Sequence, residues 1–120
     1  MREIETLLEE FRSNLPGVSL VAVFTKYGEY IASISPQSSD ITIINNILAI
    51  IQRFVDEIDF EEEYERTVFE GKDEVITIKP FAKKMYIAAI ASNSVIKLGL
   101  LWLDLDKTVK KIENIIMAEG

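Results

Sequence analysis

One stretch of the sequence, Asp40–Phe60, limits the possible folds more than any other. Plotted as an α-helix at about 100° per residue, it places its apolar side chains on one arc of about 180°. That arc consists of Ile41, Ile43, Ile44, Ile47, Leu48, Ile50, Ile51, Phe54, Val55 and Ile58. A helix with a single packing surface needs an apolar stripe of only about 100°. We therefore expect a helix that packs on its own sheet with part of the arc and on another surface with the rest.

Two interpretations of this arc stay open on the sequence alone. In the first, the helix is sunk deeply into the core of its own domain. In the second, which we favour, one part of the arc faces the sheet and the other part meets the same helix of a second copy. The residues that would face the second copy are Ile43, Ile47, Ile50 and Phe54. Each such burial contributes roughly 1.5–3 kcal/mol, which could offset much of the cost of association.

The composition excludes several classes of function. With 120 residues, the chain is expected to form a single domain over residues 1–120. It has no cysteine and no histidine, which excludes disulfides, thiol nucleophiles and histidine-based acid–base chemistry. The net charge of −7 opposes binding to nucleic acid or to an anionic membrane. The apolar runs are far shorter than the ~18 residues of a membrane span, and the lack of cysteine fits a cytoplasmic protein.

The rest of the chain predicts helices and strands in a definite order. A helix over Arg2–Asn14 is stopped by Pro16-Gly17, since proline disfavours a helical residue before it. The predicted strands are Val18–Thr25, Glu29–Ile34, Tyr64–Glu70, Val75–Lys79 and Met85–Ala91, with a turn over Pro80–Lys84. Short connections make neighbouring strands antiparallel. The order α-β-β-α-β-β-β-α therefore predicts an α/β (α+β) domain.

The last segment is apolar enough to be mistaken for a strand. Its larger apolar residues nevertheless share one helical stripe of about 100°: Leu98, Leu101, Trp102, Leu105, Val109, Ile112 and Ile116. This spacing predicts a helix. Leu100 and Leu103 lie outside the stripe, so they are either exposed or cover a second surface.

The strand Tyr64–Glu70 should lie at an edge of the sheet, because the more apolar strands belong in the centre. It carries both charge signs, with Glu65 and Arg66 before Val68 and Glu70 after it. Charges on an edge strand can prevent unwanted pairing. They can also meet opposite charges of a second copy across a two-fold axis. In that case Arg66 and Val68 join the dimer interface.

The sequence shows no catalytic apparatus. The glycines form neither of the two phosphate-binding signatures, GxGxxG and GxxxxGK[ST]. The acidic run between Asp56 and Glu65 lacks the alternating acids and central glycine of an EF-hand. No base is identifiable beside a nucleophile. We expect a protein that is not an enzyme and that holds no cofactor and no metal.

Several local features together resemble the roadblock/dynein-light-chain family, that is, domains of the roadblock/LC7 type with MglB-like members. Pro16-Gly17-Val18 leads into an apolar strand, and Gly28 precedes Ile31-Ala32-Ser33 in the second strand. Leu98-Gly99-Leu100 opens the last helix. The resemblance spans about Arg2–Met117 and rests on this combination, together with the order of the elements.

The resemblance implies a profilin-like, five-stranded antiparallel sheet of strand order 2-1-5-4-3, with helices on both faces. Family members dimerise through the third strand and the second helix. For this chain that implies a homodimer interface of Ile43, Ile47, Ile50, Phe54, Arg66 and Val68.

The function implied is regulation or scaffolding of a Ras-like small GTPase, including stimulation of GTP hydrolysis. Asn46 and Arg53, on the polar arc, are the candidate contacts with the GTPase. Stimulation often uses an arginine finger, but nothing distinguishes Arg2, Arg12, Arg53 or Arg66 as one. We expect the GTPase's own switch residues to be remodelled instead. The alternatives are a dimeric adaptor of the dynein-light-chain kind with no GTPase contact, and a small-ligand sensor with an apolar pocket.

Overall fold

The computed structural model describes residues 2–25, 29–34, 46, 49–50, 53, 66–82 and 85–119. In chain order the elements are α1 (Arg2–Asn14), β1 (Val18–Thr25), β2 (Tyr30–Ile34), β3 (Thr67–Glu70), β4 (Glu74–Phe81), β5 (Met85–Ser92) and α3 (Leu98–Glu119). The strands form one antiparallel sheet in the order β2-β1-β5-β4-β3. The predicted sheet order is therefore confirmed.

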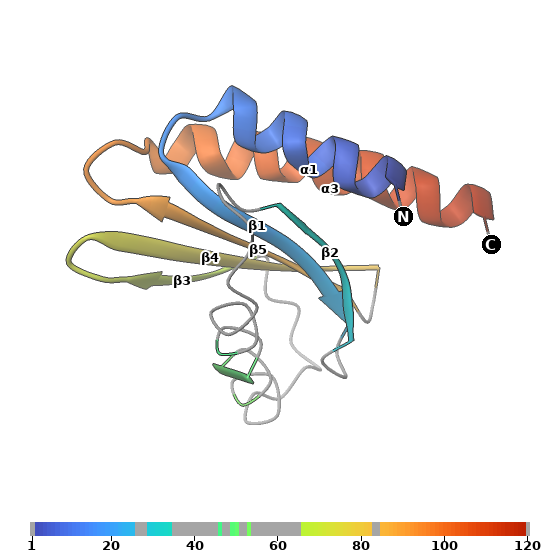
Figure 1. The fold of residues 1–120 in the computed structure, drawn as a ribbon, viewed down its shortest axis with the longest axis horizontal. Helices are drawn as coiled ribbons and strands as arrows, with labels where there is room; N and C mark the ends of the chain where they lie inside the picture. The colour runs from blue at the N-terminus through green and yellow to red at the C-terminus, as the bar shows by residue number, and fades with distance from the viewer. Residues whose placement is uncertain are drawn as a thin grey trace.

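The two long helices, α1 and α3, lie side by side on one face of the sheet (Figure 1). Alternate residues of the central strands β1 and β5 point towards these helices, as the strand period of two requires. Val21 and Ile87 from the sheet pack in the same buried cluster as Leu8 of α1 and Leu105 of α3. This cluster is the main hydrophobic core.

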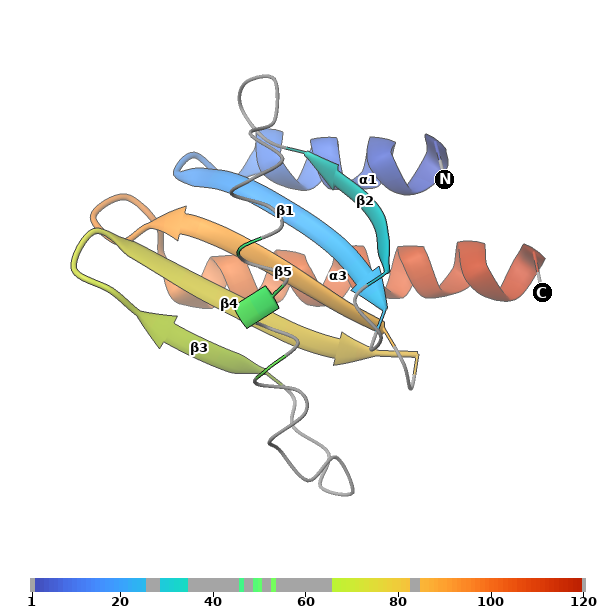
Figure 2. The same cartoon turned by 60° about the horizontal axis from the view of Figure 1, so that its bottom comes forward.

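The opposite face of the sheet is also apolar and buried. Phe24 and Tyr86, neighbours on β1 and β5, stack their rings with centroids 5.6 Å apart. The described positions within residues 46–53, green in Figures 1 and 2, lie on this side of the sheet, away from α1 and α3. All four of them, residues 46, 49, 50 and 53, are helical. The rest of the expected helix, with Ile43, Ile47 and Phe54, lies outside the described residues.

The junction between α1 and β1 follows the prediction. The helix ends at Asn14, and Gly17 has a φ of +103°, a left-handed conformation that favours glycine. Its carbonyl oxygen accepts a hydrogen bond of 2.8 Å from the backbone N–H of Ser92, at the end of β5. A Cβ at this position would lie 3.1 Å from Cγ1 of Val95. The glycine thus gives both the turn and the close approach of two chain segments.

The predicted turn over Pro80–Lys84 begins too early. Strand β4 runs on through Pro80 to Phe81, where it pairs with Met85. A proline is tolerated in a strand where no N–H is needed, as at an unpaired edge. The register between β3 and β4 ends at Ile78, so β4 has no described neighbour on that side beyond this point. Strand β3, in turn, begins at Thr67, with Arg66 just before it.

Helix α3 is the helix that the spacing of its apolar residues predicted. Leu101, Leu105 and Ile112 are fully buried, whereas Leu100 and Leu103 are each 51% exposed. The open question about these two leucines is thus answered for the single chain: they face away from its core.

Candidate interaction surface

The outer edge of β3 presents backbone hydrogen-bonding groups. Among the described strands, β3 pairs with β4 alone. The N–H of Gly71 donates to the carbonyl oxygen of Glu74 at 2.7 Å. Gly71 and Glu74 are therefore a hydrogen-bonded pair, which shows which residues of β3 bond to β4. Because bonded and non-bonded pairs alternate, Thr67 and Phe69 turn their backbone groups towards β4. Val68 and Glu70 turn theirs outwards, where another strand could pair with them.

A charged cluster lies between this edge strand and α3. The carboxylate of Asp106 accepts from Arg66 Nη2 at 3.5 Å and lies 3.0 Å from Lys79 Nζ. The Arg66 guanidinium also lies over the ring of Trp102, 4.8 Å from its centroid, a distance suited to a cation–π contact. Two cations therefore share one carboxylate. The Arg66 side chain, on the edge, is 25% exposed.

The described part of the expected second helix is exposed. Ile50 is 60% exposed to solvent, and Asn46 and Arg53 are exposed as well. An isoleucine this open contributes little to the core of its own chain. Together with the β3 edge, these residues form the candidate interaction surface.

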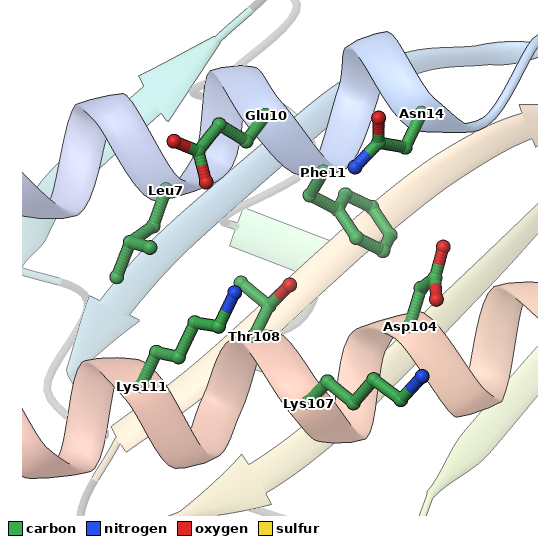
Figure 3. A pocket seen from close by; sticks show the side chains of 8 residues that line it. All are labelled: Leu7, Glu10, Phe11, Asn14, Asp104, Lys107, Thr108 and Lys111. Atoms are coloured by element: carbon green, nitrogen blue, oxygen red, sulfur yellow. The ribbon is translucent and has the colours of Figure 1, made fainter.

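A shallow groove runs between the two helices on the other side of the sheet (Figure 3). Its volume is about 220 Å³. It is lined by Leu7, Glu10, Phe11, Asn14, Asp104, Lys107, Thr108 and Lys111. Polar and charged side chains thus dominate the lining, in contrast to the apolar pocket that a small-ligand sensor would need.

Known proteins match this chain in a comparison of structures but not in comparisons of sequence. No protein-family model matches the chain, and no curated protein matches it by sequence. The Roadblock/LC7 domain from Streptomyces avermitilis superposes with a TM-score of 0.77 at 14% identity, covering 94% of this chain and 97% of that one. Myxococcus xanthus MglB gives 0.74 at 18% identity, covering 97% and 96%. A structure described as MglB with tetrameric arrangement gives 0.80 at 10% identity, covering 95% and 88%.

The chain has the roadblock/LC7 fold. At these identities the likeness establishes the fold, including the MglB-like arrangement of its elements. The resemblance inferred from short motifs in the sequence is confirmed at this level.

On this roadblock/LC7 fold, the predicted site residues fall into two groups. Val68 lies in the edge strand and Arg66 just before it, with both side chains on the α3 side of the sheet. Asn46, Ile50 and Arg53 belong to the exposed helical positions. Ile43, Ile47 and Phe54 lie outside the described residues, so the structure does not place them.

Sequence reasoning missed the partners of Arg66 and the groove. Asp106 and Trp102 come from a helix some forty residues further along the chain. The only signal in the sequence was that Asp106 and Trp102 lie one turn apart on the helix, at spacing i and i+4. Among the described residues, no three histidine, cysteine or acidic side chains gather as a metal site would require. None of the described helices has a stretch long and apolar enough to span a bilayer.

Proposed function

We propose that this chain forms a homodimer that binds a Ras-like small GTPase and modulates its nucleotide cycle, without chemistry of its own. The observation that carries the proposal is the match to MglB structures along almost the whole chain, with TM-scores of 0.74 and 0.80. The resemblance found in the sequence links domains of this type to GTPase regulation. The open β3 edge and the exposed Ile50 support the dimeric part.

The β3 edge suits antiparallel pairing with a second copy. We place Val68 on the two-fold axis, opposite the partner's Val68, because its backbone groups point outwards. Arg66 then lies opposite the partner's Glu70, and each copy contributes one such pair. Opposite charges that face each other across strands contribute roughly 0.2–1 kcal/mol.

Two other registers bring these like charges together. A shift in one direction sets Glu70 against the partner's Glu70, and a shift in the other sets Arg66 against the partner's Arg66. Like charges directly opposite are destabilising. Among the described residues, the Arg66 cluster has two cations and one carboxylate, so a carboxylate of the partner can join it. Charge therefore favours the register centred on Val68 over these two.

We assign the GTPase contact to the exposed helical residues Asn46 and Arg53. Arg66 is a poor arginine finger, because Asp106 and Trp102 already hold its guanidinium. Arg53 is exposed in the described structure, and its positive charge can pair with an acidic partner surface. Any stimulation of hydrolysis would then come from repositioning of the GTPase's own switch residues.

The test is binding to Ras-like GTPases of the source organism, each loaded with GDP or with a non-hydrolysable GTP analogue. We expect co-elution in one nucleotide state and an altered rate of phosphate release. Arg53→Glu should weaken binding by about tenfold or more, since charge reversal in an interface costs more than 1.4 kcal/mol. Lys72→Glu, an exposed change in the β3–β4 turn, is the matched control and should bind like the wild type.

Two results would contradict the proposal. Binding that is indifferent to nucleotide, with unchanged turnover, would favour the dimeric adaptor. Equal losses for Arg53→Glu and Lys72→Glu would remove the assigned contact.

A further inference from the structure

Helix α3 carries an unusual outward surface. Leu100 and Leu103 are each 51% exposed, and Lys107, Lys110 and Lys111 are exposed too. We call these five residues the α3 outer surface. Leu100, Leu103, Lys107 and Lys110 follow one another at intervals of three or four residues, so they form a single stripe along the helix. The stripe covers about 15 Å at 1.5 Å per residue.

The neighbours of α3 show that this stripe points away from the molecule. On one side of α3, Asp106 contacts Arg66 and Lys79 beneath the edge strand. On the other side, Asp104, Lys107, Thr108 and Lys111 line the groove against α1 (Figure 3). Leu100, Leu103 and Lys110 lie between these two flanks, and Lys107 and Lys111 extend the α3 outer surface to the groove. This surface is separate from the β3 edge and from the helical positions across the sheet, so it stays available in the proposed dimer.

The charge of this surface differs from that of the whole chain. The protein has a net charge of −7, yet the α3 outer surface holds three lysines and no acidic residue. Of the nearby acids of α3, Asp106 holds Arg66, whereas Asp104 lines the groove together with Lys107 and Lys111. A local positive potential next to exposed leucines favours an acidic partner that also has apolar side chains.

Helix α1 of a second copy does not supply such a partner. The exposed residues of α1 include Glu3, Glu5, Glu9 and Glu10, which have the right charge. They stand among Arg2, Thr6 and Ser13, with no exposed large apolar side chain on α1 for the leucines to meet. The glutamates of α1 could face the lysines of α3, but no apolar side chain of α1 would cover Leu100 and Leu103.

The α3 outer surface suits a single helix better than a flat anionic membrane. Because α1 lies beside α3 on the same face of the sheet, a bilayer laid on α3 would also meet the glutamates of α1 (Figure 1). Those glutamates would repel anionic headgroups. A single helix lying along α3 avoids them, and helices dock on one another through stripes with spacings of three and four residues.

We propose that the α3 outer surface docks an acidic, amphipathic α-helix of another protein. The apolar stripe of that helix packs on Leu100 and Leu103. Its glutamates or aspartates lie against Lys107, Lys110 and Lys111. Such docking would link the dimer to a second partner while the GTPase surface stays open.

The probe is a labelled synthetic peptide of three heptads, with leucine at the a and d positions and glutamate at most others. Its binding to the full chain is followed by anisotropy, and the contact is mapped by amide chemical shifts. A matched peptide has lysine in place of every glutamate. We expect the acidic peptide to bind and to shift residues 100–111, and added salt to weaken it, since these charges are exposed.

Two double variants divide the surface into its apolar and charged parts. Leu100→Ser with Leu103→Ser, and Lys107→Glu with Lys110→Glu, should each weaken the acidic peptide by about tenfold or more. Because all four side chains are exposed, both variants should fold, which circular dichroism checks. Lys72→Glu is the matched control and should leave binding unchanged.

Several results would overturn the proposal. They are no binding of the acidic peptide, equal binding of the lysine peptide, or unchanged affinity in both double variants. Stronger binding to vesicles of phosphatidylcholine with phosphatidylglycerol than to the peptide would replace the helix with a lipid surface. A change in oligomeric mass in the double variants would instead assign the surface to contacts between copies.

Discussion

At the residue scale, Gly17 combines a positive φ with a close neighbour. Its φ of +103° is one that side chains rarely adopt, and a Cβ would lie 3.1 Å from Cγ1 of Val95, which would have to shift. Gly17→Ala should therefore lower the free energy of unfolding by about 1–3 kcal/mol, as measured by urea denaturation. Gly99→Ala is the control, and it should raise the free energy of unfolding. Its Cβ would meet nothing within 4 Å, and alanine favours a helix by about 0.5–1 kcal/mol. Equal effects at the two sites would contradict this assignment.

Tyr86 gives a second prediction at this scale. Burial raises the pKa of its phenol above the ordinary value of 10.0, because the charged form is poorly solvated there. The unfolded chain then loses this proton at a lower pH than the folded chain. The free energy of unfolding should stay level with respect to this group below about pH 10 and fall as the pH rises through the folded pKa.

The measurement is stability against pH for the wild type and for Tyr86→Phe. The variant keeps the ring that stacks on Phe24 and removes the ionisable group. Its stability should fall less steeply above pH 10. Parallel curves for the two proteins would show that Tyr86 does not contribute.

At the element scale, local signals were enough where the element is decided locally. The bounds of α1 and β1 match the prediction because Pro16-Gly17 interrupts the chain between them. The helix α3 was predictable from its apolar spacing, despite a strand-like composition. The end of β4 was not predictable from local signals. Pro80 fits in β4 because the pairing with β3 ends at Ile78, and that end point depends on another strand.

The candidate surface shows the same division. Charges on an edge strand directed attention to Arg66 and Val68, and the wide apolar arc directed it to Ile50. The contacts of Arg66 with Asp106 and Trp102 depend on how α3 crosses the sheet, which no local pattern records. The groove between α1 and α3 has the same origin.

At the scale of the whole molecule, two features of the described residues bear on the proposed dimer. Two helices cover one face of the sheet, and their apolar stripes are buried there. At its edge, β3 turns backbone groups outwards, and Ile50 is 60% exposed across the sheet. The proposed dimer, in which a second copy pairs with β3 and covers Ile50, would account for both features.

The mass of the protein in solution tests this dimer most directly. Light scattering should give the wild type twice the 13.6 kDa of one chain. Ile50→Glu should give a mass close to that of one chain, because a buried, unpaired carboxylate costs several kcal/mol. Leu103→Glu, at a position on α3 that is 51% exposed, should keep the wild-type mass. A wild type of 13.6 kDa, or an Ile50→Glu variant that keeps the dimer mass, would contradict the account.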